Sequence, residues 1–312
     1  MRKLFFLIIV VLLILIASVY VFIPNFIPFS QGLLVNATRD GIYRSLQDEK
    51  NWDKWWPEKG DNKTGHVFSY HGFYYSLDDR KVTSITVSIS KNDTRAITNL
   101  DLVSTNTDSA DIVWQGVLPT SYNPIKRLQK YLEAKQINKD IGILIKNMRS
   151  FFSKPENIYG FAIRQEPVID SILVSTFATA KGYPSTAFIY NLLNQLRDYV
   201  KNQSAKETGY PMLNIGTEDS INYLTRVAIP VDKELKSSGN ISYKRMLGRG
   251  KILVTEVKGG PGSISNAFYQ MKNYVSDYQR VAPAIPFLSL VTDRIKEPDS
   301  SKWITRVYYP VM

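Results

Sequence analysis

The sequence predicts an α+β protein in which one apolar helix at the N-terminus precedes two soluble domains. Three observations carry this prediction. Residues 4–22 form an apolar run without a charge. Strand-like segments between residues 66 and 118 precede a helical pattern over residues 123–152. The segment at residues 223–231 recurs at residues 303–311, which indicates an internal duplication.

The N-terminal run predicts a single-pass membrane anchor over residues 1–29. About 20 apolar residues in a helix span the hydrocarbon core of a bilayer. A cleaved signal peptide is the alternative, but this run exceeds the usual apolar length of roughly 7–15 residues and no clear cleavage site follows. Arg2 and Lys3 precede the run, and the next charged residue is Arg39. The positive-inside rule therefore predicts a cytoplasmic N-terminus and a periplasmic or otherwise extracytoplasmic body.

The composition fits two domains and excludes several kinds of site. A chain of 312 residues exceeds what one compact core usually supports, and 44% hydrophobic residues with 21% charged residues is typical of globular proteins. Because the chain has no cysteine, disulfides and thiolate chemistry are excluded. Its two histidines, His66 and His71, lack a nearby acid at metal-ligand spacing, and we expect them at the surface or a strand edge. We expect no metal and no cofactor.

The net charge of +11 is spread along the chain, without the long basic block of a nucleic-acid-binding arm. No helix-turn-helix segment stands outside the two predicted domains. We therefore expect no direct nucleic-acid binding. The positive charge indicates a solvated, lysine-rich surface, with some attraction to anionic lipid head groups near the anchor.

The first predicted domain covers residues 30–153. Thr38 is placed to cap a short helix that ends near Leu46. A long helix with an apolar stripe closes the domain. Between the two helices, β-branched and aromatic residues predict strands at residues 66–77, 81–90, 95–104 and 110–118.

Residues 37–46, followed by Trp55, Trp56 and Pro57, resemble the opening of START-like or polyketide-cyclase (SRPBCC) helix-grip domains. The resemblance implies a sheet bent around the last helix, an apolar cavity between them, and binding of a lipid or small molecule. The candidate lining residues are the aromatic residues Trp56, Phe68, Tyr70, Phe73, Tyr75 and Trp114, of which we select Trp56 and Trp114 as site residues. The alternative is that these large aromatic side chains fill a packed core.

The second predicted domain, residues 158–312, is a duplicated strand-helix-strand-strand unit. Besides residues 223–231 and 303–311, residues 211–215 match residues 286–290. Each unit contains a strand, a glycine turn, a helix and two further strands. Two helices are thus expected on one face of an antiparallel sheet, flanking a ligand cleft on the pseudo-twofold axis.

Residues 166–169, 257–262 and 305–311 resemble a GyrI-like effector-binding domain, which also forms the ligand-sensing half of AraC-type regulators. The resemblance implies a pocket with aromatic walls for amphipathic or cationic molecules, and a buried glutamate on the strand after the second helix. That strand has no acid here, so Glu256 on a neighbouring strand is the candidate substitute, with a solvent-facing position as the alternative. The candidate ligand-binding residues in this domain are Glu256, Tyr269, Tyr308, Tyr190 and Trp303.

The two repeats also place Arg226 and Arg306 at equivalent positions, where they either brace the sheet or contact the ligand. The leading hypothesis is a membrane-anchored, non-catalytic binder or sensor of small amphipathic or hydrophobic molecules. One alternative is a hydrolase that uses Glu256 with Tyr269 or Tyr308 as an acid–base pair. Another is a scaffold for a partner protein, with both cavities filled by side chains.

Overall fold

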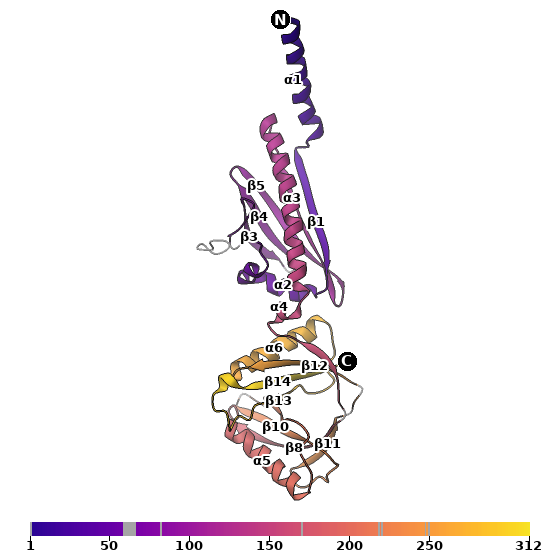
Figure 1. The fold of residues 1–312 in the computed structure, drawn as a ribbon, viewed down its shortest axis with the longest axis vertical. Coiled ribbons are helices and arrows are strands. Elements are labelled where there is room, and N and C mark those ends of the chain that lie inside the picture. Colours follow the sequence, from indigo (N-terminus) through magenta and orange to yellow (C-terminus); the bar gives the residue numbers. More distant parts are fainter. Residues whose placement is uncertain are drawn as a thin grey trace. The chain divides into compact units, whose positions relative to one another are not determined.

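The computed structural model describes residues 2–58, 67–81, 83–169, 171–217, 219, 221–246, 248 and 250–312. The chain divides into two compact units, Met1–Lys154 and Pro155–Met312 (Figure 1). Each unit has its own antiparallel sheet and is described separately. His66, the predicted start of the first domain's first strand, lies outside the described residues.

The first unit begins with an apolar helix, α1 (Arg2–Phe22). Over Lys3–Phe22 it is long and apolar enough to cross a membrane, and its side chains from Leu4 to Ile16 are exposed. The helix stops where Pro24 cannot continue the backbone hydrogen bonding. Arg127 then donates from Nε and Nη2 to the carbonyl oxygen of Ile23, at 2.9 and 2.5 Å. The end of α1 is therefore attached to the long helix of the same unit.

The sheet of the first unit has the strand order β1-β6-β5-β4-β3-β2. Its strands are β1 (Phe26–Val35), β2 (Val67–Tyr70), β3 (Phe73–Lys81), β4 (Ser84–Lys91), β5 (Thr94–Asn106) and β6 (Ser109–Pro119). Between β1 and β2 lie α2 (Arg39–Gln47), which Thr38 caps as predicted, and the 3₁₀ helix η1 (Glu49–Lys54). Along β4, Ile85, Val87 and Ile89 are fully buried, which confirms the predicted alternation.

The long helix α3 (Pro124–Phe152) packs against β1 and β6. Its buried stripe includes Ile137, Ile141, Leu144 and Met148, the positions that the helical period indicated. Asn123 caps the helix by accepting from the backbone amides of Ile125 and Lys126. Together, α3 and the sheet enclose the core of the unit.

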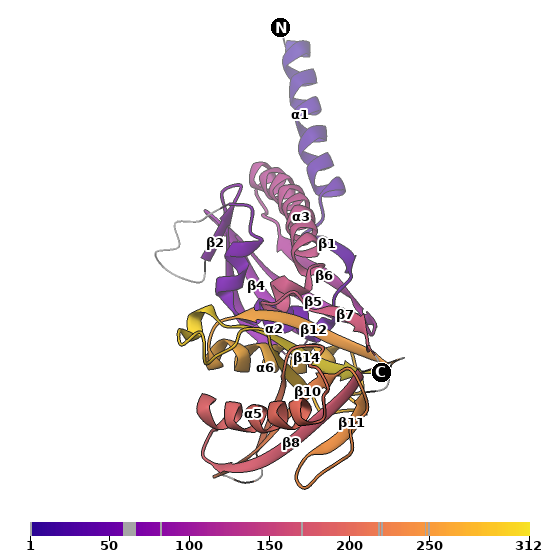
Figure 2. The same cartoon turned by 60° about the horizontal axis from the view of Figure 1, so that its bottom comes forward.

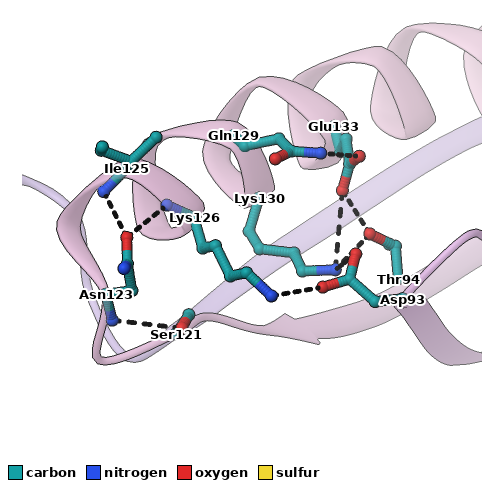
Figure 3. Close-up of polar contacts among 9 residues, drawn as sticks. All are labelled: Asp93, Thr94, Ser121, Asn123, Ile125, Lys126, Gln129, Lys130 and Glu133. Carbon is teal, nitrogen blue, oxygen red and sulfur yellow. Dashed lines mark hydrogen bonds and ion pairs between the residues drawn. The ribbon is translucent and has the colours of Figure 1, made fainter.

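Polar contacts fix the start of α3 to the turn between β4 and β5 (Figure 3). Lys130 Nζ lies 3.1 Å from Asp93 Oδ1 and also donates to Thr94 Oγ1, which in turn donates to Glu133. The hydrogen bond from Lys130 lowers the pKa of the Asp93 carboxyl below its usual value. This network provides partners for the mostly buried ammonium group of Lys130, because a buried charge is unfavourable unless it is paired.

The second unit contains the duplicated strand-helix-strand-strand order predicted from the repeat. The first copy is β8 (Ser171–Lys181), α5 (Thr186–Asn202), β9 (Met212–Thr217) and β10 (Asn222–Val231). The second copy is β12 (Lys251–Lys258), α6 (Pro261–Asp277), β13 (Phe287–Leu290) and β14 (Ile304–Val311). The sheet order β11-β8-β10-β9-β13-β14-β12-β7 reads symmetrically from its centre, where Leu213 pairs with Leu288. These two leucines are equivalent in the repeat.

The outer strands exchange between the two halves, which the sequence did not indicate. The strand before the first copy, β7 (Arg164–Pro167), pairs with β12 of the second copy. The strand before the second copy, β11 (Ser242–Met246), pairs with β8 of the first copy. A backbone hydrogen bond of 2.9 Å from Val168 to Gly250 joins the segments that follow them. The exchange ties the two edges of the sheet together.

Both long helices of this unit pack on one face of its sheet (Figure 2). α5 contacts β8 and β10, and α6 contacts β12 and β14. The core beneath them includes Leu193, Leu196, Ala267 and Met271 together with alternate strand residues. Along β12, however, residues of both faces are buried. The face without helices therefore also contains buried side chains. The unit is completed by a short helix, α4 (Pro155–Tyr159), and a 3₁₀ helix, η2 (Ser300–Lys302).

Candidate functional site

The helix-free face of the second unit's sheet contains two adjoining cavities, of about 650 and 500 Å³. Strand alternation explains why side chains gather there. Thr225 and Val227 are buried beneath the helices, so Arg226 and Ala228 point to the opposite face. Both volumes lie within the range of roughly 300–1,000 Å³ that ligand pockets usually have.

Apolar side chains form the shared wall of the two cavities. Val168, Met212, Met246, Ile252 and Phe287 line both of them. Met212, Met246, Ile252 and Phe287 come from β9, β11, β12 and β13, respectively. The wall therefore depends on the exchange of outer strands, which places β11 beside β8. Two of them are methionines, whose unbranched side chains adapt to ligands of different shape. The wall is suited to an apolar ligand group.

The charged residues that line the larger cavity are all basic: Arg226, Lys244, Arg245 and Lys251. Among its described lining residues none is acidic. Arg226 donates from Nη1 to Asn214 Oδ1, at 3.1 Å. The smaller cavity has one acidic lining residue, Glu166, among the described ones. The larger cavity thus combines an apolar wall with positive charge.

Of the predicted site residues, Tyr308 alone lines either of these cavities. Its ring stacks on Phe287 with centroids 5.0 Å apart and planes inclined by 13°. It faces the smaller cavity together with Ile252 and Ser289. Tyr308 therefore contributes aromatic surface to the smaller cavity.

Glu256 lies elsewhere than expected. Its side chain is 47% exposed and accepts from Arg306 Nε at 3.0 Å, across the β12–β14 pair. This contact raises the pKa of the Arg306 guanidinium. Glu256 lines neither cavity on this face. Its carboxylate is paired with Arg306. Glu256 thus has the solvent-facing position that was the alternative to a place in the ligand site.

A further cavity of about 600 Å³ lies on the helix-covered face near the pseudo-twofold axis. Tyr183, Tyr223 and Phe268 line it, and Leu213 and Leu288 of the central strands also contribute. This is the expected position of the cleft. The strands at the centre of the sheet there are β9 and β13, and the strands of Glu256 and Tyr308 lie further out.

Tyr190 and Trp303 meet at a buried arginine. The Tyr190 hydroxyl accepts from the backbone amide of Arg294 at 2.7 Å, and the guanidinium lies 4.5 Å from the centre of the Trp303 ring. Arg294 Nη2 also donates to Thr305 Oγ1 at 3.1 Å. Burial lowers the pKa of Arg294. This cluster holds the β13–β14 connection in place, while Tyr269 is exposed on α6.

Trp56 and Trp114 are packed into the core of the first unit. Trp56 contacts Trp52, Phe68 and Tyr75, and its Nε1 donates to the Ser69 carbonyl at 2.7 Å. Trp114 is fully buried and donates to Thr98 Oγ1 at 2.8 Å. These contacts agree with the alternative that the aromatic residues fill the core.

No group of three or more His, Cys, Asp or Glu side chains that could hold a metal occurs among the described residues. His71 lies on the turn between β2 and β3, and its Nδ1 is 2.8 Å from the buried Asp140 Oδ1. Asp140 also accepts from Gln136 at 2.7 Å. The pair joins this turn to α3.

Sequence reasoning singled out Arg226, as the repeat equivalent of Arg306, but it did not single out the other residues that line the larger cavity. Met246 and Lys244 lie on β11, whose pairing with β8 brings them to the cavity. Their position depends on the exchange of outer strands, for which the sequence carries no local signal. The strand register is also needed to show that Phe177, and not an acidic residue, stands opposite Arg226.

No family model matches the chain, and no curated protein matches its sequence. Among the solved structures with a similar fold, three each cover about half of it. The EcmrR C-terminal domain is 18% identical, with 49% of this chain and 98% of that chain covered and a TM-score of 0.43. SAV2435 bound to tetraphenylphosphonium is 16% identical, with coverages of 48% and 93% and a TM-score of 0.32. A hydrolase from Listeria innocua is 10% identical, with coverages of 48% and 91% and a TM-score of 0.36.

Proposed function

We propose that this protein is a membrane-anchored binder of small amphipathic or hydrophobic molecules, which occupy the larger cavity on the helix-free face of the second unit. The observation that carries the proposal is a 650 Å³ cavity with an apolar wall and a few convergent polar groups. Such a combination is typical of small-molecule sites. Transfer of apolar ligand surface from water to this wall supplies the affinity, at about 25 cal/mol per Å².

The hydrolase alternative is less well supported. It needs Glu256 to act as an acid or base with Tyr269 or Tyr308. Glu256 instead accepts a hydrogen bond from Arg306, and Tyr269 projects from α6, which covers the opposite face of the sheet. The scaffold alternative needs cavities filled by side chains, whereas the second unit contains open ones. Binding without chemistry is therefore the function that we favour.

We further propose that α1 spans a membrane, with a cytoplasmic N-terminus and the two units on the other side. Exposed apolar side chains outside α1 support this assignment. Phe26 begins β1, and Tyr122 and Ile125 lie at the start of α3, close to the end of α1. Tyr20 of α1 donates to the carbonyl oxygen of Tyr122, which ties the two segments together. Aromatic and apolar residues at such a junction suit the interface between lipid and water.

Residues 30–153 and 158–312 are proposed as the two soluble domains. The curled sheet and long helix of the first unit support its resemblance to START-like helix-grip domains. Because Trp56 and Trp114 pack into its core, we assign ligand binding to the second unit. The first unit then connects this binding unit to the membrane anchor.

Calorimetric titration of the full chain in lipid nanodiscs tests the proposed function. We expect decanol or decanoate to give a saturable signal that empty nanodiscs do not give. Ala228→Trp places an indole in the larger cavity and should abolish binding, because Ala228 lines that cavity. Ala187→Trp is the matched control, since Ala187 is exposed on α5 and should bind as the unmodified chain does. Equal binding by both variants would place the ligand elsewhere.

A further inference from the structure

The two halves of the second unit contain equivalent arginines that have different partners. Arg306 stands opposite Glu256 on the neighbouring strand, and the two side chains form an ion pair. Arg226 occupies the same place in the first half, but the residue opposite it is Phe177. On its other side, Arg226 pairs with Asn214 where Arg306 pairs with Ser289. The duplication thus leaves one arginine with a carboxylate partner and the other with an amide.

Arg226 is the arginine that lines the larger cavity. A guanidinium has five N–H donors and keeps its charge at any physiological pH. The described residues offer Arg226 one hydrogen-bond acceptor, Asn214 Oδ1 at 3.1 Å. The remaining donors are suited to a planar, two-oxygen acceptor such as a carboxylate, which guanidinium groups bind with two parallel hydrogen bonds.

The surroundings of Arg226 also favour an anion. Lys244 stands opposite Leu173 on the same face, and both residues line the cavity. With no acidic side chain among the described residues that line it, the larger cavity carries an excess of positive charge. Positive charge inside a concave, partly apolar site attracts anions and repels cations. A cationic ligand would instead need an excess of negative charge in the cavity.

We propose that the larger cavity selects amphipathic anions, with a carboxylate-like head group on Arg226 and Lys244 and an apolar tail along Met212, Met246, Ile252 and Phe287. The inference rests on the proposed function and specifies the chemistry of its ligand. The apolar wall begins beside the arginine, because Met212 and Asn214 lie on the same face of β9. A medium-chain fatty acid has this division between a charged head and an apolar tail.

Three probes with the same tail separate the charge inference from the proposed function: decanoate, decanol and decyltrimethylammonium, titrated into the full chain in zwitterionic nanodiscs. We expect decanoate to bind tightest and the ammonium compound weakest. Arg226→Gln should weaken decanoate by about 10- to 100-fold, the loss expected for a charge-assisted contact, and leave decanol nearly unchanged. Arg306→Gln is the matched control and should leave all three affinities as they are.

The inference is overturned if the ammonium compound binds as tightly as decanoate, or if Arg226→Gln weakens decanol as much as decanoate. Either result leaves the cavity as a ligand site and removes its preference for anions. Absence of binding for all three probes would overturn the proposed function itself. Should Arg226→Gln fail to fold, as shown by thermal denaturation, the order of the three affinities in the unmodified chain still decides the question.

Discussion

Replacing Trp52 by alanine is expected to destabilise the first unit by about 3–5 kcal/mol, the usual effect of removing a buried tryptophan. Trp52 is fully buried, and its ring lies 5.0 Å from Trp55, 6.0 Å from Trp56 and 5.5 Å from Phe68. Its Nε1 also donates to the Leu46 carbonyl at 2.9 Å, which joins η1 to α2. The substitution removes the centre of this aromatic cluster and leaves a buried carbonyl without its donor.

Urea denaturation followed by tryptophan fluorescence measures this loss. Trp55, Trp56 and Trp114 remain in the first unit of the variant, while Trp303 is in the second. Tyr74→Ala is the control, because Tyr74 is 55% exposed and removal of its ring should cost little stability. A loss below about 1 kcal/mol for Trp52→Ala would mean that the cluster is not the core of this unit.

Deleting residues 4–22 is expected to move the whole chain from the membrane fraction to the soluble fraction. The deleted segment contains nearly all of the apolar surface of α1, and its length matches the hydrocarbon core. Replacing the same residues with an equally long run of leucine and alanine should restore membrane association, since hydrophobicity and length rather than sequence determine insertion. Alkaline extraction of membranes followed by immunoblotting measures the distribution.

The same experiment distinguishes an anchor from a signal peptide. A tag placed before Arg2 should remain on the mature full-length chain if the helix is retained. Loss of the tag, with a soluble body, would show that the segment is cleaved. A deletion variant that stays in the membrane after alkaline extraction would instead show that another part of the chain provides the anchor.

Local patterns were sufficient to predict most elements of the fold. The alternation of Ile85, Val87 and Ile89 gave the buried face of β4, and the helical stripe ending near Met148 gave the inward face of α3. The repeat predicted the order of strands and helix along the chain in both halves of the second unit, but not the order of the strands in the sheet. These features depend on short-range periodicity or on internal similarity, both of which are visible in one sequence.

The site was harder to predict because it depends on long-range pairing. The family resemblance suggested Glu256 as a ligand-binding residue, but Glu256 forms an ion pair with Arg306 on the adjacent strand. Lys244 and Met246 reach the cavity only through the exchange of β7 and β11 between the halves. The cavity therefore arises from strand register and topology, which no local pattern of residues encodes.

Photoaffinity labelling tests the central claim, that ligands occupy the helix-free face of the second unit, most directly. The full chain in nanodiscs would be irradiated with a medium-chain fatty acid that carries a diazirine in its tail, and the adducts located by mass spectrometry. We expect adducts at Met212, Met246, Ile252 or Phe287 that excess decanoate suppresses and that Ala228→Trp prevents. Suppressible adducts confined to Tyr183 and Phe268 on the helix-covered face, or to the first unit, would contradict the account.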